Sequence, residues 1–338
     1  MKFSVIIPVH NAEQTLERCL RSVQTQSFSD FEAIIVDDGS ADQSSAIARK
    51  YAETDYRFRY VYQENQGVSA ARNHGINKAV GEFVVFLDSD DQYKTEYLQQ
   101  FNRLIAEYPE CDHFWCSYES IDIFGREQES FGCLDVDGKT VISERAEVMS
   151  LHEKALDAAL WNKAFRKQLI DKYQLKMDES LSLGEDMLFN YAYLDVGRRN
   201  IVLFNYPLYI YTKAENDTLN SRYRSNLKQI YDVINHQLLY YLKKWGASSD
   251  QIAKFYNSVF FSMERVLYNT YRAECVLPSA EKKKFNNELL KSEEFQTALK
   301  LSNCSIHPLY RSAYKTGNWG LIMLLDRIVK IKRRLMRR

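Results

Sequence analysis

The sequence predicts an α/β protein in which a mainly parallel β-sheet is covered by helices and followed by a smaller α-helical region. Short runs of β-branched and aromatic residues alternate with helical patterns over the first part of the chain. These runs are mostly apolar, which is typical of strands buried on both faces of a parallel sheet. The chain has 338 residues, enough for about two domains.

The expected strands and helices alternate from the start of the chain. Residues 3–7 form the first strand, which ends at Pro8. Asn11, followed three residues later by Gln14, predicts a capped helix that runs to about residue 24. The next strands and helices are expected, in chain order, at residues 31–36, 41–54, 60–62, 68–80 and 83–87.

The second part of the chain is expected to be mostly helical. The helical pattern begins near residue 151, and Gly184 opens a short helix. Residues 206–211 are the last expected strand, and a polar, amphipathic helical pattern follows. We therefore place a domain boundary that divides the chain into residues 1–215 and residues 216–338.

The composition excludes several classes of protein. Lys and Arg number 45 and Asp and Glu also number 45, so the net charge is zero, and the hydrophobic share of 45% is that of an ordinary globular chain. No apolar run is long enough for a polytopic membrane protein, and Pro8 interrupts the N-terminal run too early for a signal peptide. The six cysteines form no Cys-x-x-Cys pair, so we expect reduced thiols and a cytoplasmic protein.

Acidic side chains follow two of the expected strands at the point where each strand ends. Asp37 and Asp38 follow the second strand, and Asp88 and Asp90 follow the fourth. Because ligands of such sheets bind beyond the carboxyl ends of the strands, we expect one shared site there. Asp88 and Asp90, two carboxylates two residues apart, suit a Mg²⁺ or Mn²⁺ ion that assists a diphosphate leaving group. The alternative is that they are ordinary turn or cap residues.

Other charged residues each have a functional and an ordinary interpretation. Asp38 can accept a hydrogen bond from a base N–H, or it is part of a plain Asp-Gly turn. The planar fork of Arg72 suits a diphosphate or a base, whereas a solvated arginine on a helix is the alternative. Glu185 and Asp186 start a helix, where carboxylates are favoured as caps, but a carboxylate there can also remove a proton from an acceptor hydroxyl.

Four motifs in register, over about the first 110 residues, resemble those of bacterial family 2 glycosyltransferases of the GT-A fold. Two later segments resemble the acceptor-side motifs of members that build capsular and other surface polysaccharides. The four motifs are FSVIIPVHN at residues 3–11, IIVDDGS at 34–40, NQGVSAARN at 65–73 and FLDSDD at 86–91, and the later segments are LWNK at 160–163 and ED at 185–186.

The resemblance implies inverting transfer from a nucleotide sugar, usually a UDP-sugar, with Mn²⁺ or Mg²⁺. It makes residues 1–215 the GT-A domain, which binds the nucleotide sugar and carries out catalysis. It also implies a role for each matched residue. By position, the nucleoside and diphosphate would be held by Pro8, Val9, Asp38, Asn65 and Arg72. Asp90 would be the main metal ligand, and Asp88 would lie near the ribose or the metal, with Ser89 beside it. Asp186 would be the catalytic base, Glu185 would lie near the donor sugar, and the acceptor would contact Trp161 and Lys163. A domain-packing role is the alternative for Trp161.

The sequence departs from this family in one place. Relatives often carry an arginine shortly after the Tyr-x-Tyr of the last strand, whereas here Tyr209-Ile210-Tyr211 is followed by Thr212 and Lys213. Either Lys213 replaces that cation or another residue closes over the diphosphate. No third metal ligand can be named, because no histidine pair has ligand spacing.

Two other functions are compatible with parts of this sequence. A sugar nucleotidyltransferase would need a glycine-rich loop after the first strand, yet no glycine precedes Gly39. A catalytically silent scaffold or partner subunit of a polysaccharide assembly complex would keep the fold without turnover. The intact carboxylate motifs favour an enzyme.

The last 18 residues, 321–338, combine apolar and basic side chains. Leu321, Leu325 and Ile328 follow helical spacing, and residues 326–338 contain seven basic residues and one acidic residue. Such a helix can lie on an anionic membrane surface, or it is a packed terminal helix with a solvated end. Because basic residues are concentrated only here, nucleic-acid binding is not expected. The resemblance implies a glycan or lipid-linked oligosaccharide acceptor and a place at the inner face of the plasma membrane, and a homo-oligomer is compatible with the sequence.

Overall fold

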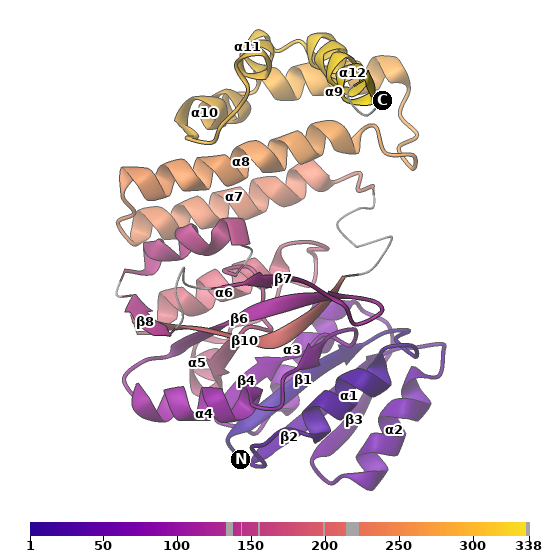
Figure 1. Ribbon diagram of the computed structural model, residues 1–338, viewed down its shortest axis with the longest axis vertical. Helices are drawn as coiled ribbons and strands as arrows, with labels where there is room; N and C mark the ends of the chain where they lie inside the picture. The colour runs from indigo at the N-terminus through magenta and orange to yellow at the C-terminus, as the bar shows by residue number, and fades with distance from the viewer. Residues whose placement is uncertain (133–137, 143, 155, 199, 214–222, 336–338) are drawn as a thin grey trace. The chain divides into compact units, whose positions relative to one another are not determined.

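The computed structural model describes residues 1–132, 138–142, 144–154, 156–198, 200–213 and 223–335. Contacts divide the chain into two compact units, Met1–Asn216 and Asp217–Arg338. The predicted boundary after residue 215 lies among residues 214–222, outside the described part of the chain. Figure 1 shows the strands of the first unit and the helices of the second.

Four parallel strands form one half of the sheet of the first unit. They lie in the order β3-β2-β1-β4, so β1 is central and pairs with a parallel strand on either side. All residues of β1 and β2 are buried, which explains why both are mostly apolar in sequence. The prediction of an α/β fold with a mainly parallel sheet is therefore confirmed. The bounds are β1 (Phe3–Val9), β2 (Phe31–Asp38), β3 (Phe58–Gln63) and β4 (Phe83–Phe86).

Helices follow these strands, and the first of them starts at a different residue from the one predicted. The first helix begins at Leu16 rather than at a capping box formed by Asn11 and Gln14. Asn11 instead has a positive φ of 51°, and its side-chain oxygen accepts a hydrogen bond from the Ala41 N–H at 2.8 Å. The predicted cap is therefore wrong, because the asparagine joins two loops at the strand ends. The helices are α1 (Leu16–Gln24), α2 (Ser44–Thr54), α3 (Val68–Lys78) and α4 (Tyr97–Glu107).

The other half of the sheet contains strands that the sequence did not reveal. Beyond β4 the order continues β9-β6-β10-β5, with β9 antiparallel to both of its neighbours. β10 is 13 residues long, far longer than the expected strand at 206–211, and runs beside β6 (Figure 1). The bounds are β5 (Gln92–Tyr93), β6 (His113–Asp122), β9 (Lys163–Arg166) and β10 (Ile201–Lys213), with β7 (Glu127–Phe131) and β8 (Lys139–Ile142) pairing at the side.

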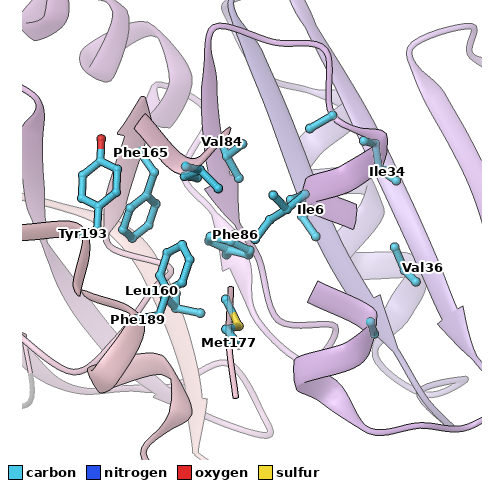
Figure 2. Packing of buried hydrophobic residues seen from close by; sticks show 14 residues of the cluster. Ile6, Ile34, Val36, Val84, Phe86, Leu160, Phe165, Met177, Phe189 and Tyr193 are labelled. Carbon is cyan, nitrogen blue, oxygen red and sulfur yellow. The ribbon is translucent and has the colours of Figure 1, made fainter. Parts of the chain in front are cut away.

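An apolar cluster joins the two halves of the sheet to the helix that begins at Glu185. Figure 2 shows Phe86 on β4 facing Phe165 on β9 and Phe189 on α6 (Glu185–Val196). The rings meet edge to face, with centroids 5.7 Å apart for Phe86 and Phe165 and 5.5 Å apart for Phe165 and Phe189. This packing holds the start of α6 close to the end of β4. The 3₁₀ helix η1 (Arg145–Lys154) and α5 (Lys167–Tyr173) complete the unit.

The second unit is helical in its described part. Phe260, Phe295 and Tyr314 form its aromatic centre, with ring centroids 5.5–5.8 Å apart. No helix among the described residues is long and apolar enough to cross a bilayer. The helices are α7 (Leu227–Lys244), α8 (Ser249–Asn269), α9 (Ser279–Lys291), α10 (Glu293–Leu301), α11 (Pro308–Thr316) and α12 (Trp319–Leu335).

We predict that Gly75→Ala lowers the free energy of unfolding by about 1–3 kcal/mol. A Cβ at Gly75 on α3 would lie 2.4 Å from a methyl carbon of Ile6 on β1, so the helix would have to move off the sheet. Equilibrium unfolding in guanidinium chloride measures the loss. Gly320→Ala on α12 is the control, since a Cβ there approaches only the Asn318 side chain, at 3.2 Å. Its change should stay below about 1 kcal/mol, and equal losses would contradict the prediction.

Candidate functional site

An acidic turn lies at the end of β4, as the sequence predicted. Asp88 and Ser89 are half-buried, whereas Asp90 is exposed. Asp88 Oδ1 accepts a hydrogen bond from Arg72 Nη2 at 2.9 Å. No side chain in the described part of the chain donates to the Asp90 carboxylate. Desolvation by the surrounding protein, followed by repulsion from Asp88, raises the pKa of Asp90.

Arg72 connects this turn to the start of α6. Arg72 is only 7% exposed, and its Nη1 lies 3.4 Å from Oε1 of Glu185, 113 residues away in sequence. Gly184 adopts a φ of 81° and starts the helix, so Glu185 and Asp186 occupy its first turn. The structure thus brings the predicted residues Arg72, Asp88, Glu185 and Asp186 into one charged cluster.

The environment of Glu185 and Asp186 raises the pKa values of both carboxyls. Burial, and then the charge of Asp186, raises the pKa of Glu185 to about 7. Burial also raises the pKa of Asp186, while the positive charge of Arg72 opposes that rise. Asp186 Oδ1 accepts a hydrogen bond from the Met187 N–H at 2.8 Å. Carboxyls with raised pKa values are stronger bases than exposed ones and are common at catalytic sites.

The residues that hold the acidic turn in place were not predicted. Asp91 is 1% exposed and accepts hydrogen bonds from the Tyr209 hydroxyl at 2.6 Å and the Thr212 N–H at 2.7 Å. Arg18 on α1 donates to the Asp90 carbonyl at 2.6 Å and to the Thr212 hydroxyl at 3.2 Å. The turn is thereby fixed to β10. The only indication of this role in the sequence is that Asp91 is the fourth residue of the acidic run at residues 88–91.

Asp38 shapes the loop that follows β3. It is 3% exposed, and its carboxylate accepts hydrogen bonds from the Gln63 side chain, the Gln66 N–H and the Gly67 N–H, each at 2.8 Å. These bonds occupy most of its acceptor positions. That Asp38 accepts a hydrogen bond from a base N–H therefore stays a prediction. In the structure its carboxylate holds the loop after β3 in place.

Asn65 lies exposed in this loop, close to the ends of β1 and β2. Its side-chain nitrogen is 3.3 Å from Nε2 of His10, and the residue packs against the backbone of Gly39. A Cβ at Gly39, where φ is 71°, would lie 2.8 Å from the backbone nitrogen of Asn65, so only glycine fits at this position. Pro8 and Val9 end β1 beside β2. The predicted nucleoside-binding residues thus share one edge of the sheet.

Trp161 belongs to an aromatic group between β6 and β10. Its ring stacks on Tyr209, with centroids 4.1 Å apart, and meets Tyr118 edge to face at 4.8 Å. Tyr211 lies further along the same stack, at 6.2 Å. The half-buried Trp161 therefore packs within the domain, as its alternative interpretation held. Stacking on a sugar stays a prediction.

The position of Lys163 differs from the predicted acceptor contact. Its side chain is 1% exposed, and its ammonium group donates to the Leu156 carbonyl at 2.6 Å, the Asn162 side chain at 2.8 Å and the Ala159 carbonyl. The ammonium also lies 4.2 Å from the centre of the Trp115 ring. A buried cation with these partners holds the segment before β9 and is not presented to an acceptor. The prediction is corrected accordingly.

The described residues fit a divalent cation only in part. No group of three histidine, cysteine, aspartate or glutamate side chains that could hold a metal occurs in the described ranges. Asp88 and Asp90 are close enough for their charges to repel, and Asp90 faces solvent. These two carboxylates suit a hard cation that takes its other ligands from water and substrate phosphates. Lys213, which the sequence offered as a replacement for the family's arginine, forms an ion pair with Glu129, with 2.6 Å between Nζ and Oε2.

Comparison with known proteins places this site in a family. A model described as "Glycosyl transferase family 2" matches residues 4–174. The chain belongs to glycosyl transferase family 2. This family 2 chain is 33% identical over 66% of its length to EpsH of Bacillus subtilis (strain 168). It is 31% identical over 69% of its length to TarS of Staphylococcus aureus (strain Mu50 / ATCC 700699), a poly(ribitol-phosphate) beta-N-acetylglucosaminyltransferase. The aligned parts span 64% of EpsH and 39% of TarS.

Solved structures agree on the fold of the family 2 chain. Residues 1–349 of S. aureus TarS, solved with UDP-GlcNAc, match with a TM-score of 0.65 at 23% identity, covering 93% of this chain and 88% of that one. A mannosyltransferase from Pyrobaculum calidifontis, solved with GDP-Man and Mn²⁺, matches with a TM-score of 0.50 at 17% identity, covering 94% and 87%. The predicted GT-A fold is confirmed by this likeness to TarS.

We predict that Tyr209→Phe lowers the free energy of unfolding by about 1–3 kcal/mol, because Asp91 loses one of its two hydrogen-bond donors while staying buried. Guanidinium unfolding measures the loss, and hydrogen exchange of the peptide over residues 86–93 should show faster exchange in the acidic turn. Tyr206→Phe, an exposed position on the same strand, should change stability by less than about 0.5 kcal/mol. Unchanged exchange in Tyr209→Phe would contradict the assigned role of its hydroxyl.

We predict that Glu185 makes the protein less stable as the pH rises from about 4.3, the usual pKa of glutamate, to about 7. Its raised pKa means that the folded state binds more protons than the unfolded state in this window, so stability falls with pH there. Glu185→Gln has no proton to lose, and its stability relative to the unaltered protein should rise across the window and then level off. Chemical denaturation in pH steps measures this.

The control for the pH series is Glu281→Gln, an exposed carboxyl on α9. Its stability should follow that of the unaltered protein at every pH. If the Glu185→Gln curve also ran parallel, Glu185 would not be the group that titrates.

Proposed function

We propose that this chain is an inverting glycosyltransferase that moves a hexose or N-acetylhexosamine from a UDP-sugar to a hydroxyl of a glycan acceptor. The observation that carries the proposal is the ion pairing of Arg72 with both Asp88 and Glu185. It joins the acidic turn at the end of β4 to the start of α6, beyond the carboxyl ends of the parallel strands, where ligands of such sheets bind. Membership of glycosyl transferase family 2 supports the proposal.

The reaction is a single displacement. The acceptor oxygen bonds to the anomeric carbon as the bond from that carbon to the UDP oxygen breaks, and the acceptor proton passes to the carboxylate of Asp186. Burial raises the pKa of Asp186, which suits a general base. UDP leaves with the electron pair of the broken bond, so no protein nucleophile is needed. Glu185 lies beside the base and is proposed to contact the donor sugar.

A divalent cation such as Mn²⁺ or Mg²⁺, when bound, would supply positive charge next to the departing diphosphate. Asp90 would be its main protein ligand, with Asp88 beside it and Ser89 close by. The guanidinium of Arg72, which pairs with Asp88 at 2.9 Å, is proposed to neutralise charge on the same diphosphate. Thus the chain presents carboxylates toward the cation and an arginine toward phosphate.

The donor nucleoside is proposed to lie along Pro8, Val9, Asp38 and Asn65, which share one edge of the sheet. A UDP-sugar is proposed as the donor because TarS, a relative with the same fold, was solved with UDP-GlcNAc. The acceptor is proposed to be a lipid-linked intermediate of a surface polysaccharide, received by residues of the first unit near Trp161. The division of labour between residues 1–215 and 216–338, and assembly as a homo-oligomer, belong to the same proposal.

We predict that the chain releases UDP from one member of a panel of UDP-galactose, UDP-glucose and their N-acetylamino forms with Mn²⁺, and not with EDTA. Asp186→Asn should lower that rate about 100- to 10,000-fold, the contribution typical of a general base. Asp90→Asn should weaken UDP binding in Mn²⁺ while leaving binding in EDTA unchanged. UDP release and calorimetric titration measure these effects.

The control is Asp250→Asn, an exposed aspartate in the second unit, which should keep full activity. If the unaltered chain bound UDP with Mn²⁺ yet turned over no donor, and Asp186→Asn changed nothing, the chain would be the catalytically silent scaffold. If UDP with Mn²⁺ did not bind at all, the assignment of Asp88, Asp90 and Arg72 would be wrong.

A further inference from the structure

α12 carries an exposed apolar stripe on the face opposite to the one that packs. Trp319 and Ile322 are at most 1% exposed, whereas Leu321, Leu324 and Ile328 are 37%, 53% and 53% exposed. Successive residues of an α-helix are about 100° apart, so positions two residues apart point to nearly opposite sides. The sequence suggested Leu325 for this stripe, but that residue is half-buried, and Leu324 takes its place.

The packed face of α12 is held by specific polar contacts as well as by burial. The Trp319 indole N–H donates to the Tyr271 hydroxyl at 2.7 Å. The Asp326 carboxylate accepts hydrogen bonds from Tyr268 at 2.8 Å and Tyr310 at 2.6 Å. These contacts to α8 and α11 fix the rotation of the helix, so that the stripe of Leu321, Leu324 and Ile328 stays on the outer face.

The charge of this helix is of one sign beyond Asp326. Residues 327–338 contain seven basic residues and no acidic residue, and the one acid before them is engaged by the two tyrosines. α12 extends through Leu335, so five of the basic positions lie on the described helix, while Arg337 and Arg338 lie outside the described residues. In the sequence, Ile331 and Leu335 continue the spacing of three and four residues that relates the exposed apolar positions.

We propose that the outer face of α12 binds the surface of an anionic lipid bilayer. A helix with an apolar stripe and basic flanks lies in the plane of the interface, with the stripe in the acyl boundary and the cations at lipid phosphates. Both features are needed, because single apolar anchors bind reversibly and weakly and the basic charge adds attraction to anionic headgroups. The membrane is bound from one side, since no described helix can cross it.

A second copy of the chain fits this face less well. A symmetric dimer formed through α12 would bring together two copies of a segment, residues 327–338, that contains seven basic residues and no acidic residue. Three exposed apolar residues also cover far less than the about 800 Å² per partner of a typical stable interface. Nucleic acid would attract the charge but leave the apolar stripe in water.

Co-sedimentation of the full chain with vesicles tests the proposal. Vesicles of phosphatidylcholine with about one-third phosphatidylglycerol should bind the chain at least about ten times more tightly than phosphatidylcholine alone, and about 0.5 M salt should weaken that binding. The triple variant Leu321→Ser, Leu324→Ser, Ile328→Ser should lose about tenfold or more. Independently, Arg333→Gln with Arg334→Gln, Arg337→Gln and Arg338→Gln should lose as much without altering the apolar stripe.

The control is Val276→Ser with Leu309→Ser, two exposed apolar residues of the same unit outside α12, 92% and 60% exposed. It should bind vesicles like the unaltered chain. Equal binding to both vesicle types, no binding, or equal loss in the control would overturn the proposal. A fall in oligomer mass by light scattering in the triple variant, without any lipid effect, would assign the face to a second copy. The measurement needs no sugar transfer, so it is independent of the proposed function.

Discussion

Arg72 lies buried between two acidic segments that come from distant parts of the chain, and the candidate site depends on this one guanidinium. A buried charge is stable only when it is paired and hydrogen-bonded, and Arg72 meets that condition through Asp88 and Glu185. The benefit is mutual, because burial and then the charge of Asp186 raise the pKa of Glu185, and the charge of Arg72 opposes that rise. These two ion pairs link α3, the end of β4 and the start of α6.

The part of the fold that could be predicted is the part that local sequence encodes. β1, β2 and β4 are buried on both faces, so their mostly apolar sequences identify them without reference to the rest of the molecule. β9 is only four residues long and gains its identity from pairing with β4 and β6 on either side. β10 extends far beyond the strand expected at residues 206–211, and it accommodates Pro207 through a shift in register. Such pairings are tertiary and leave little trace in sequence.

The candidate site divides in the same way. Asp88, Asp90 and Arg72 could be selected from sequence because strand ends and a family motif point to them. Lys163 matched a motif as well, but its surroundings bury it, which no pattern of letters could reveal. Asp91 was passed over although it is the buried member of the acidic run. Whether a charged side chain faces a ligand or supports its neighbours is decided by the elements that pack around it.

The order in which the site's components occur along the chain has a consequence for biosynthesis. A nascent chain emerging from the ribosome contains β1 to β4 and Arg72 by residue 86, but Glu185 follows Arg72 by 113 residues, and the strand that carries Tyr209 and Thr212 comes later still. Domains fold as units while synthesis proceeds from the N-terminus. The first unit extends to Asn216, so its acidic turn leaves the ribosome before β10, the strand that holds this turn in place. A chain that ended before β10 would lack the hydrogen bonds from Tyr209 and Thr212 to Asp91, and its acidic turn would be more exposed to proteolysis.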